Sequence, residues 1–254
     1  MVLGVFLMSV LAGCAIQLSS TLMKTHVRGE CVVLVHGLWR SGAAMSSIET
    51  FLSKQGYDTI AIDYPSTRKP IPILAEQYLG AQGVDECMSR GAEKIHLVTH
   101  SMGGILARQY LQSNRLPPGS RIVMLSPPNQ GSELSRTFSD AWWFDWVVGP
   151  AGGSLTQEGE GIIHRLKPIT APVGIIAAYR DWSLWPDGWL PAPNDGTVSV
   201  QSMVLEEMDD FILVNSGHAM MRSNETVHSQ IGHFLESGRF LAPVTAGQEK
   251  WAGE

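Results

Sequence analysis

The fold is decided by the stretch Lys94–Leu106, which reads K-I-H-L-V-T-H-S-M-G-G-I-L. A short apolar run ends at a turn that carries Ser101, and apolar residues then return at helical spacing. This pattern predicts a strand, a sharp turn and a helix, with a serine at the apex of the turn. In the same context, the motif G-x-S-x-G holds a serine hydroxyl above the edge of a sheet. Because Thr99 stands where the first glycine is expected, the motif needs support from the rest of the chain.

The composition is that of a globular protein with a large core. The 254 residues are 44% apolar and 17% charged, with a net charge of −6. This length suits one domain, or one domain with an insertion. No run of like charges indicates a nucleic-acid surface, so we expect no nucleic-acid partner. No spacing of Cys and His residues indicates a metal site, so we expect no metal.

The two ends of the chain are predicted to lie outside the fold. Residues 1–13 read as a lipoprotein-type signal peptide, because an apolar run is followed by small residues and then Cys14. The residues around Cys14 resemble the bacterial lipobox, and this resemblance implies lipidation of Cys14 and anchoring to the membrane of a bacterial cell envelope. A plain signal peptide, with a periplasmic or secreted product, and a buried helix remain the alternatives. Residues 14–29 are predicted to be a tether, and residues 241–254 a C-terminal tail.

The two remaining cysteines are Cys31 and Cys87. In an oxidising compartment, an even pair of cysteines can form a lasting disulfide. Two buried free thiols are the alternative, since cysteine is often buried as a small apolar residue.

Residues 30–240 alternate short apolar runs with segments of helical periodicity. This alternation predicts an α/β fold, with a mostly parallel sheet of about six strands and helices on both faces. The strands are predicted at residues 31–36, 58–63, 94–100, 121–125, 173–178 and 211–215, and helices at 44–54, 73–88, after Ser101, and at 226–235.

Residues 129–168 interrupt this alternation and are predicted to form an aromatic-rich cap over the sheet. The segment is long for a connection in a compact domain, and such segments are often functional. It carries Trp142, Trp143 and Trp146, which are candidate substrate-binding residues because an apolar lid suits an acyl chain. The alternative is that these tryptophans belong to the core.

Four features fall at the carboxyl ends of predicted strands, where doubly wound sheets place their sites. They are His36-Gly37, Ser101, Asp195 and His218. A serine hydroxyl needs an adjacent base, an imidazole can serve as that base, and a carboxylate fixes the imidazole tautomer. Together, these three residue types form a catalytic triad, and Ser, Asp, His is one of the known orders of its members along a chain.

Other residues compete for these roles. His228 and His233 lie in the last predicted helix, so His218 is favoured as the base because it follows a strand. Asp181 and Asp187 compete with Asp195 as the acid.

Residues from about 30 to 240 resemble an α/β-hydrolase of the lipase and esterase type. The resemblance rests on the H-G after the first strand, T-H-S-M-G-G, P-P-N-Q-G-S, N-D-G-T-V and G-H-x-M-M. It implies a nucleophile, acid and base at Ser101, Asp195 and His218, and an oxyanion hole from the N–H groups of Leu38 and Met102. It also implies hydrolysis of small-molecule or lipid carboxylic esters through an acyl-enzyme, without a cofactor. Thioesterases, amidases and lipid deacylases share this machinery, and a non-catalytic envelope protein of the same fold is a further alternative.

Overall fold

The computed structural model describes residues 29–133, 149–151, 161–181, 186 and 189–241. Several features of the sequence lie outside these residues: Cys14 with the predicted signal peptide, Trp142, Trp143 and Trp146 of the predicted cap, and most of the predicted tail. No helix in the described ranges is both long enough and apolar enough to cross a membrane.

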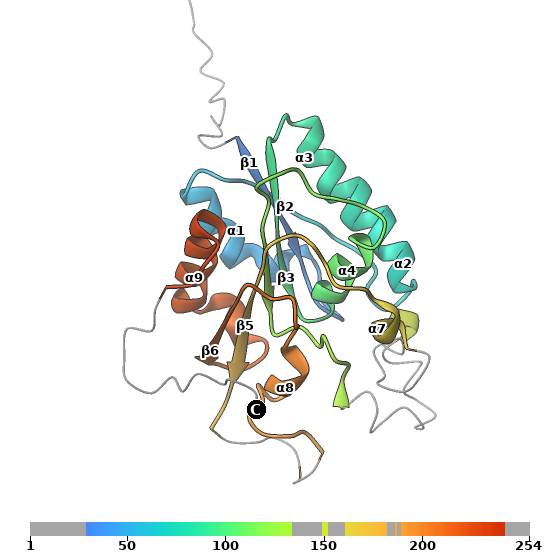
Figure 1. The fold of residues 1–254 in the computed structure, drawn as a ribbon, viewed down its shortest axis with the longest axis vertical. Coiled ribbons are helices and arrows are strands. Elements are labelled where there is room, and N and C mark those ends of the chain that lie inside the picture. Colours follow the sequence, from blue (N-terminus) through green and yellow to red (C-terminus); the bar gives the residue numbers. More distant parts are fainter. Residues whose placement is uncertain (1–28, 134–148, 152–160, 182–185, 187–188, 242–254) are drawn as a thin grey trace, which may run out of the picture.

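Six parallel strands form one sheet in the described part of the chain (Figure 1). Their order is β2-β1-β3-β4-β5-β6. β2 therefore forms one edge of the sheet, and the strands from β3 to β6 follow one another from β1 to the opposite edge. The strands are β1 (Glu30–Val35), β2 (Asp58–Ala61), β3 (Lys94–His100), β4 (Ile122–Leu125), β5 (Val173–Tyr179) and β6 (Asp210–Asn215). The predicted α/β fold is confirmed, although β2 ends two residues earlier than expected.

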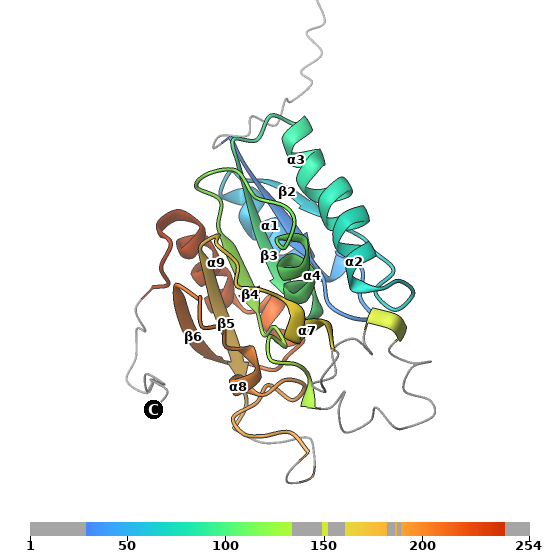
Figure 2. The ribbon, with the colours of Figure 1, turned by 45° about the vertical axis from the view of Figure 1, so that its right-hand side comes forward.

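Helices cover both faces of the sheet (Figures 1 and 2). One face carries α1 (Ser46–Lys54) and α9 (Glu225–Ser237). The other face carries α2 (Ile71–Leu74), η2 (Ala75–Val84), α3 (Asp85–Ser89), α4 (Met102–Tyr110), α7 (Ile162–Arg165) and α8 (Val200–Met203). There are also two short 3₁₀ turns, η1 (Gly42–Met45) and η3 (Met220–Ser223).

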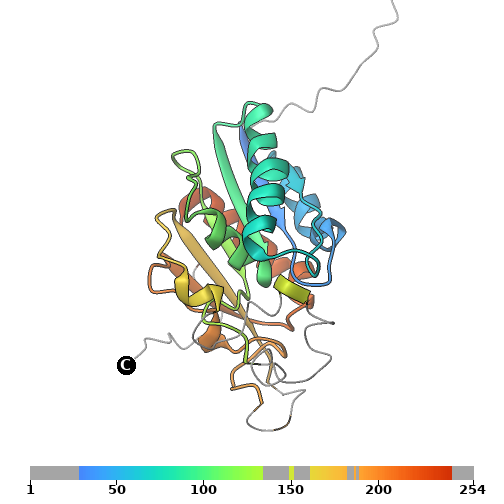
Figure 3. The same cartoon turned by 90° about the vertical axis from the view of Figure 1, so that its right-hand side faces the viewer.

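The segment predicted as one helix over residues 73–88 is a continuous helical run from α2 to α3 that lies along the sheet (Figure 3). Its middle part, η2, is a π-helix. Gly83 lets this run approach the sheet closely, because a Cβ at this position would lie 2.7 Å from a methyl carbon of Val33.

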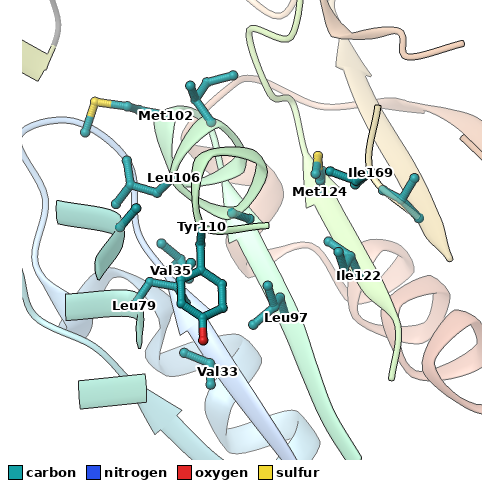
Figure 4. Packing of buried hydrophobic residues seen from close by; sticks show 14 of the residues in the cluster. Val33, Val35, Leu79, Leu97, Met102, Leu106, Tyr110, Ile122, Met124 and Ile169 are labelled. Atoms are coloured by element: carbon teal, nitrogen blue, oxygen red, sulfur yellow. The ribbon is translucent and has the colours of Figure 1, made fainter. Parts of the chain in front are cut away.

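Side chains of the central strands alternate between two apolar layers, as expected for a sheet buried on both faces. Val33 and Leu97 pack with Leu79 and Leu106 on the α4 side (Figure 4). Their neighbours Val32, Leu34 and Val98 instead pack on the side of α1 and α9. Residues of both layers are fully buried, so the two layers fix the sheet between its helices.

A disulfide joins Cys31 of β1 to Cys87 of α3. Both cysteines are fully buried in the layer that contains α4. The two cysteines are therefore bridged and are not free thiols, and the disulfide links the helical run to β1.

Candidate active site

The turn between β3 and α4 has the backbone of a nucleophile elbow. Ser101 has φ 55° and ψ −128°, a strained region that L-residues seldom adopt. Its N–H donates to the Leu125 carbonyl of β4 at 2.9 Å, which holds the turn at the sheet edge. Ser101 itself remains partly exposed. Gly103 is needed for this turn, because a Cβ there would lie 2.6 Å from the Val35 carbonyl oxygen.

The departure from the motif at Thr99 is accommodated by the helix behind it. Thr99 is fully buried. A Cβ at Gly104 would lie 3.5 Å from Thr99 Oγ1 and 2.9 Å from Pro127 Cβ, so glycine provides the necessary room. The larger side chain at the first motif position is thus compatible with the elbow.

His218 and Asp195 meet beyond the ends of β6 and β5. His218 Nδ1 lies 2.6 Å from Asp195 Oδ2, and the carboxylate is fully buried. The other carboxylate oxygen, Oδ1, accepts from the N–H groups of Thr197 at 2.9 Å and Val198 at 2.8 Å. A carboxylate can only accept, so His218 Nδ1 donates this hydrogen bond, and in the neutral ring the lone pair is then on Nε2.

The residues that compete for these roles have other partners. Asp181 is exposed, and its Oδ2 accepts from the Asn215 side chain at 2.9 Å. Asp187 lies outside the described residues. His228 Nε2 bonds to the Arg222 carbonyl at 2.8 Å, and His233 Nδ1 to the Arg239 carbonyl at 2.7 Å, so both imidazoles are held along α9.

His100 links the elbow to the His218 loop. Its Nε2 donates to the His218 carbonyl at 2.9 Å, and the two rings lie 4.7 Å apart between centroids. Burial holds the pKa of His100 well below its usual value, and the charge of His218 adds to this effect. His100 is therefore neutral, and its hydrogen bond holds the backbone of His218. Because Ser101 follows His100 directly, this contact brings the candidate base to the candidate nucleophile.

The described residues contain no hydrogen bond between Ser101 Oγ and the His218 ring. In enzymes without a bound ligand, this hydrogen bond is often long, and it shortens when the substrate binds.

The loop after β1 lies directly against the elbow. A Cβ at Gly37 would be 3.0 Å from Ser101 Cβ, so the glycine allows the next amide, that of Leu38, to approach the serine. Met102 is the first residue of α4, where backbone N–H groups lack acceptors within the helix. Neither N–H donates to a backbone or side-chain acceptor in the described ranges, so both are available to a developing oxyanion.

His36 fixes the shape of this loop. Its ring stacks on Tyr64 at 3.9 Å between centroids, and its Nδ1 donates to the Gly37 carbonyl at 2.7 Å. The Tyr64 hydroxyl donates to the His36 carbonyl. Burial lowers the pKa of His36, so the ring is neutral. Through these contacts His36 orients the loop after β1.

A buried polar network that no sequence motif predicted supports the loop that carries Asp195. The Asn129 side chain donates to the Met203 carbonyl at 2.8 Å, and Gln130 N donates to the Ser202 carbonyl at 2.8 Å. Arg108 of α4 donates to the Asn129 carbonyl at 2.9 Å. The loop after β4 is thereby tied to α8, which follows Asp195 closely. The sequence contains one signal of this network, because Arg108 follows a run of small and apolar residues in the predicted helix after Ser101.

No group of three or more His, Cys, Asp or Glu residues that could hold a metal occurs in the described segments. Residues 32–230 match the model of the alpha/beta hydrolase family. The match covers well over half of the chain, so the protein belongs to the alpha/beta hydrolase family.

Solved structures of lipases and esterases share this fold. The mature lipase BlEst2 of Bacillus licheniformis matches with a TM-score of 0.61 at 18% identity, over 82% of this chain and 91% of that one. The Pyrococcus furiosus esterase PF2001 matches with a TM-score of 0.58 at 19% identity, over 83% of each chain. A lipase-esterase related protein of Clostridium acetobutylicum matches with a TM-score of 0.55 at 15% identity, over 82% and 96%. A search of curated protein sequences finds no significant match.

Proposed function

We propose that the protein hydrolyses carboxylic esters through an acyl-enzyme, with Ser101 as nucleophile, His218 as base and Asp195 as acid. The observation that carries this proposal is the pairing of a buried Asp195 carboxylate with His218, beside a serine held at a positive φ. Membership of the alpha/beta hydrolase family and the fold shared with lipases and esterases support it.

The reaction begins when Ser101 Oγ attacks the ester carbonyl and His218 Nε2 takes the hydroxyl proton. Asp195 stabilises the imidazolium, and the amides of Leu38 and Met102 bind the oxyanion. The tetrahedral intermediate collapses, the C–O bond to the alcohol breaks, and His218 returns its proton to the departing alkoxide. Water then attacks the acyl-enzyme with His218 again as base, which releases the acid and restores Ser101.

Two measurements test this proposal. A fluorophosphonate probe is expected to label Ser101, and Ser101→Ala is expected to abolish both the label and the turnover of 4-nitrophenyl butyrate. Ser113→Ala is the matched control, because Ser113 is an exposed serine beyond the end of α4. Equal ester turnover in the parent and Ser101→Ala would instead favour a non-catalytic binding protein.

We further propose that the substrate carries an apolar acyl group, which the tryptophans near residues 142–146 would contact. The proposal rests on their number within one inserted segment. A series of 4-nitrophenyl esters from acetate to palmitate tests it. Rising kcat/KM with chain length is expected, and a profile that is flat or highest for acetate would contradict it.

The location of the protein is a separate proposal. We propose that Cys14 is lipidated and anchors the protein to a bacterial membrane, on the strength of the small residues that precede it. Cys14→Ala is expected to move the protein from the membrane fraction to the soluble fraction. Continued membrane association of that variant would contradict lipid anchoring.

A further inference from the structure

A cavity of about 540 Å³ is lined in part by the loop after β1, the loop that also carries Leu38. Its walls come from three separate segments: the loop after β1, the loop after β2, and η2. The lining residues used below are Trp39, Arg40, Asp63, Tyr64, Arg68 and Tyr78. Trp39 follows Leu38 directly, so the cavity begins one residue from a proposed oxyanion donor.

The cavity wall is continuous with the loop that faces Ser101. Tyr64 lines the cavity, stacks on His36 and donates its hydroxyl to the His36 carbonyl. Trp39 N donates to Ser66 Oγ at 3.0 Å, which joins the loop after β1 to the loop after β2. A ligand bound here would thus lie against the same backbone that holds the proposed oxyanion hole.

The charge around this cavity is opposite to that of the chain. The chain has a net charge of −6, yet two arginines, Arg40 and Arg68, line the cavity with one acid, Asp63. Within the described part of the chain, neither guanidinium makes a hydrogen bond or an ion pair. Asp63 Oδ1 lies 3.7 Å from His36 Nε2 and accepts from Gly42 N at 3.4 Å, so the acid is turned toward the loop after β1.

Two further cations, Lys69 and Arg222, lie near residues of the cavity wall. Lys69 lies 5.1 Å from the centre of the Tyr78 ring. Arg222 is partly buried and lies close enough to Arg40 for the two positive charges to repel each other. Burial is the main cause of the low pKa of His100, and both arginines lower that pKa further. The charge of Arg40 therefore acts on His100, which precedes the candidate nucleophile in the chain. Exposed arginines without ion-pair partners attract carboxylates and phosphates.

We propose that the Arg40–Arg68 cavity binds an anionic group, carboxylate or phosphate, on the ester that Ser101 attacks. The proposal rests on the proposed ester hydrolysis and names a class of substrate for it. Arg40 and Arg68 bind the anion by charge-assisted hydrogen bonds, while Trp39 and Tyr78 cover the carbon chain next to it. The anion can belong to a small soluble ester or to the headgroup of a phospholipid.

Two pairs of substrates measure this preference. The soluble pair is 4-acetoxybenzoate and its methyl ester, which differ by one negative charge on the same acetyl ester. The lipid pair is phosphatidylglycerol and 1,2-diacylglycerol in mixed detergent micelles, of which only phosphatidylglycerol carries a phosphate. For each pair, the quantity measured with the full chain is the ratio of kcat/KM for the anionic ester to that for its partner.

The expected result is a ratio that falls about tenfold in Arg68→Gln and in Arg40→Gln, the size expected for loss of one charge-assisted hydrogen bond. Arg68→Lys is expected to restore part of the ratio, and added NaCl is expected to lower it in the parent. Arg115→Gln is the matched control, because Arg115 is exposed beyond the end of α4 and so lies away from the elbow.

The pair that loses its ratio identifies the source of the anion, and loss in either pair supports the proposal. An unchanged ratio in both pairs, or an equal fall in Arg115→Gln, would overturn it. Failure of the proposed function has a different signature, since the parent would then hydrolyse the neutral esters no faster than Ser101→Ala does.

Discussion

Replacing Asp195 with asparagine tests the proposed triad most sharply, because the structure determines how the new amide is oriented. Asp195 Oδ1 accepts two backbone N–H groups, from Thr197 at 2.9 Å and Val198 at 2.8 Å. In Asp195→Asn the amide oxygen must keep these two donors, so the NH₂ group faces His218 Nδ1. His218 Nδ1 then accepts a hydrogen bond from this NH₂ group, so the ring carries its proton on Nε2 and cannot take the proton of Ser101.

The size of the loss follows from the cost of the opposite orientation. Turning the amide would leave two buried N–H donors without an acceptor, at about 1–3 kcal/mol each. The productive orientation is therefore disfavoured by about 2–6 kcal/mol, and kcat is expected to fall between about thirtyfold and about 10⁴-fold. The larger value is the loss typical of this substitution in serine proteases.

The assay measures kcat for hydrolysis of 4-nitrophenyl butyrate, and a thermal unfolding curve shows that the variant folds. Asp181→Asn is the control, because Asp181 also follows β5 but is exposed and bonded to Asn215. We expect Asp181→Asn to keep parental activity. A loss below tenfold in Asp195→Asn, or an equal loss in Asp181→Asn, would refute Asp195 as the acid.

Three other predictions concern stability. Gly103→Ala is expected to lower the free energy of unfolding by about 1–3 kcal/mol in a denaturant titration and to reduce activity, because its Cβ would lie 2.6 Å from a carbonyl of β1; parental values for both would contradict the close packing of the elbow. Burial lowers the pKa of His96 to about 4 from 6.5, so the unfolded chain binds a proton more readily between these values. The contribution of neutral His96 to the free energy of unfolding is therefore fully present above pH 6.5, and about 3 kcal/mol of it is lost as the pH drops to 4. His96→Gln is expected to flatten this pH dependence in thermal unfolding. The Cys31–Cys87 bridge spans 56 residues, so the double serine variant is expected to lose about 4 kcal/mol in chemical denaturation, and an unchanged midpoint would refute this.

The sequence was most informative where one local pattern decides the structure. The six strands are short apolar runs bounded by turns, and such runs identify buried parallel strands without knowledge of their partners. The elbow was also predictable, since a serine between a strand and a helix needs only neighbours in the chain. The end of β2 was less so, because Ile62 is as apolar as the strand residues before it.

Contacts between distant segments were not predictable in this way. The acceptor of the His100 side chain is a carbonyl 118 residues later, and no spacing in the chain indicates it. Likewise, Arg40, Arg68 and Tyr78 meet at one cavity only because β2 lies beside β1 and η2 packs against β1. The sequence records their charges but not their proximity.

The candidate site is held mainly by backbone hydrogen bonds, and this bears on how it would act. Ser101 N is fixed to β4, His218 N donates to the Asp195 carbonyl at 3.0 Å, and the Asp195 side chain is held by two amides of its own turn. These bonds exist before any substrate binds, so the Asp195 carboxylate is already in place when charge develops on the reacting groups. The arginines of the neighbouring cavity differ, because their guanidiniums are exposed and have no fixed acceptor in the described ranges. Substitutions at the triad should therefore act mainly on kcat, whereas substitutions at Arg40 and Arg68 should act mainly on KM for anionic esters.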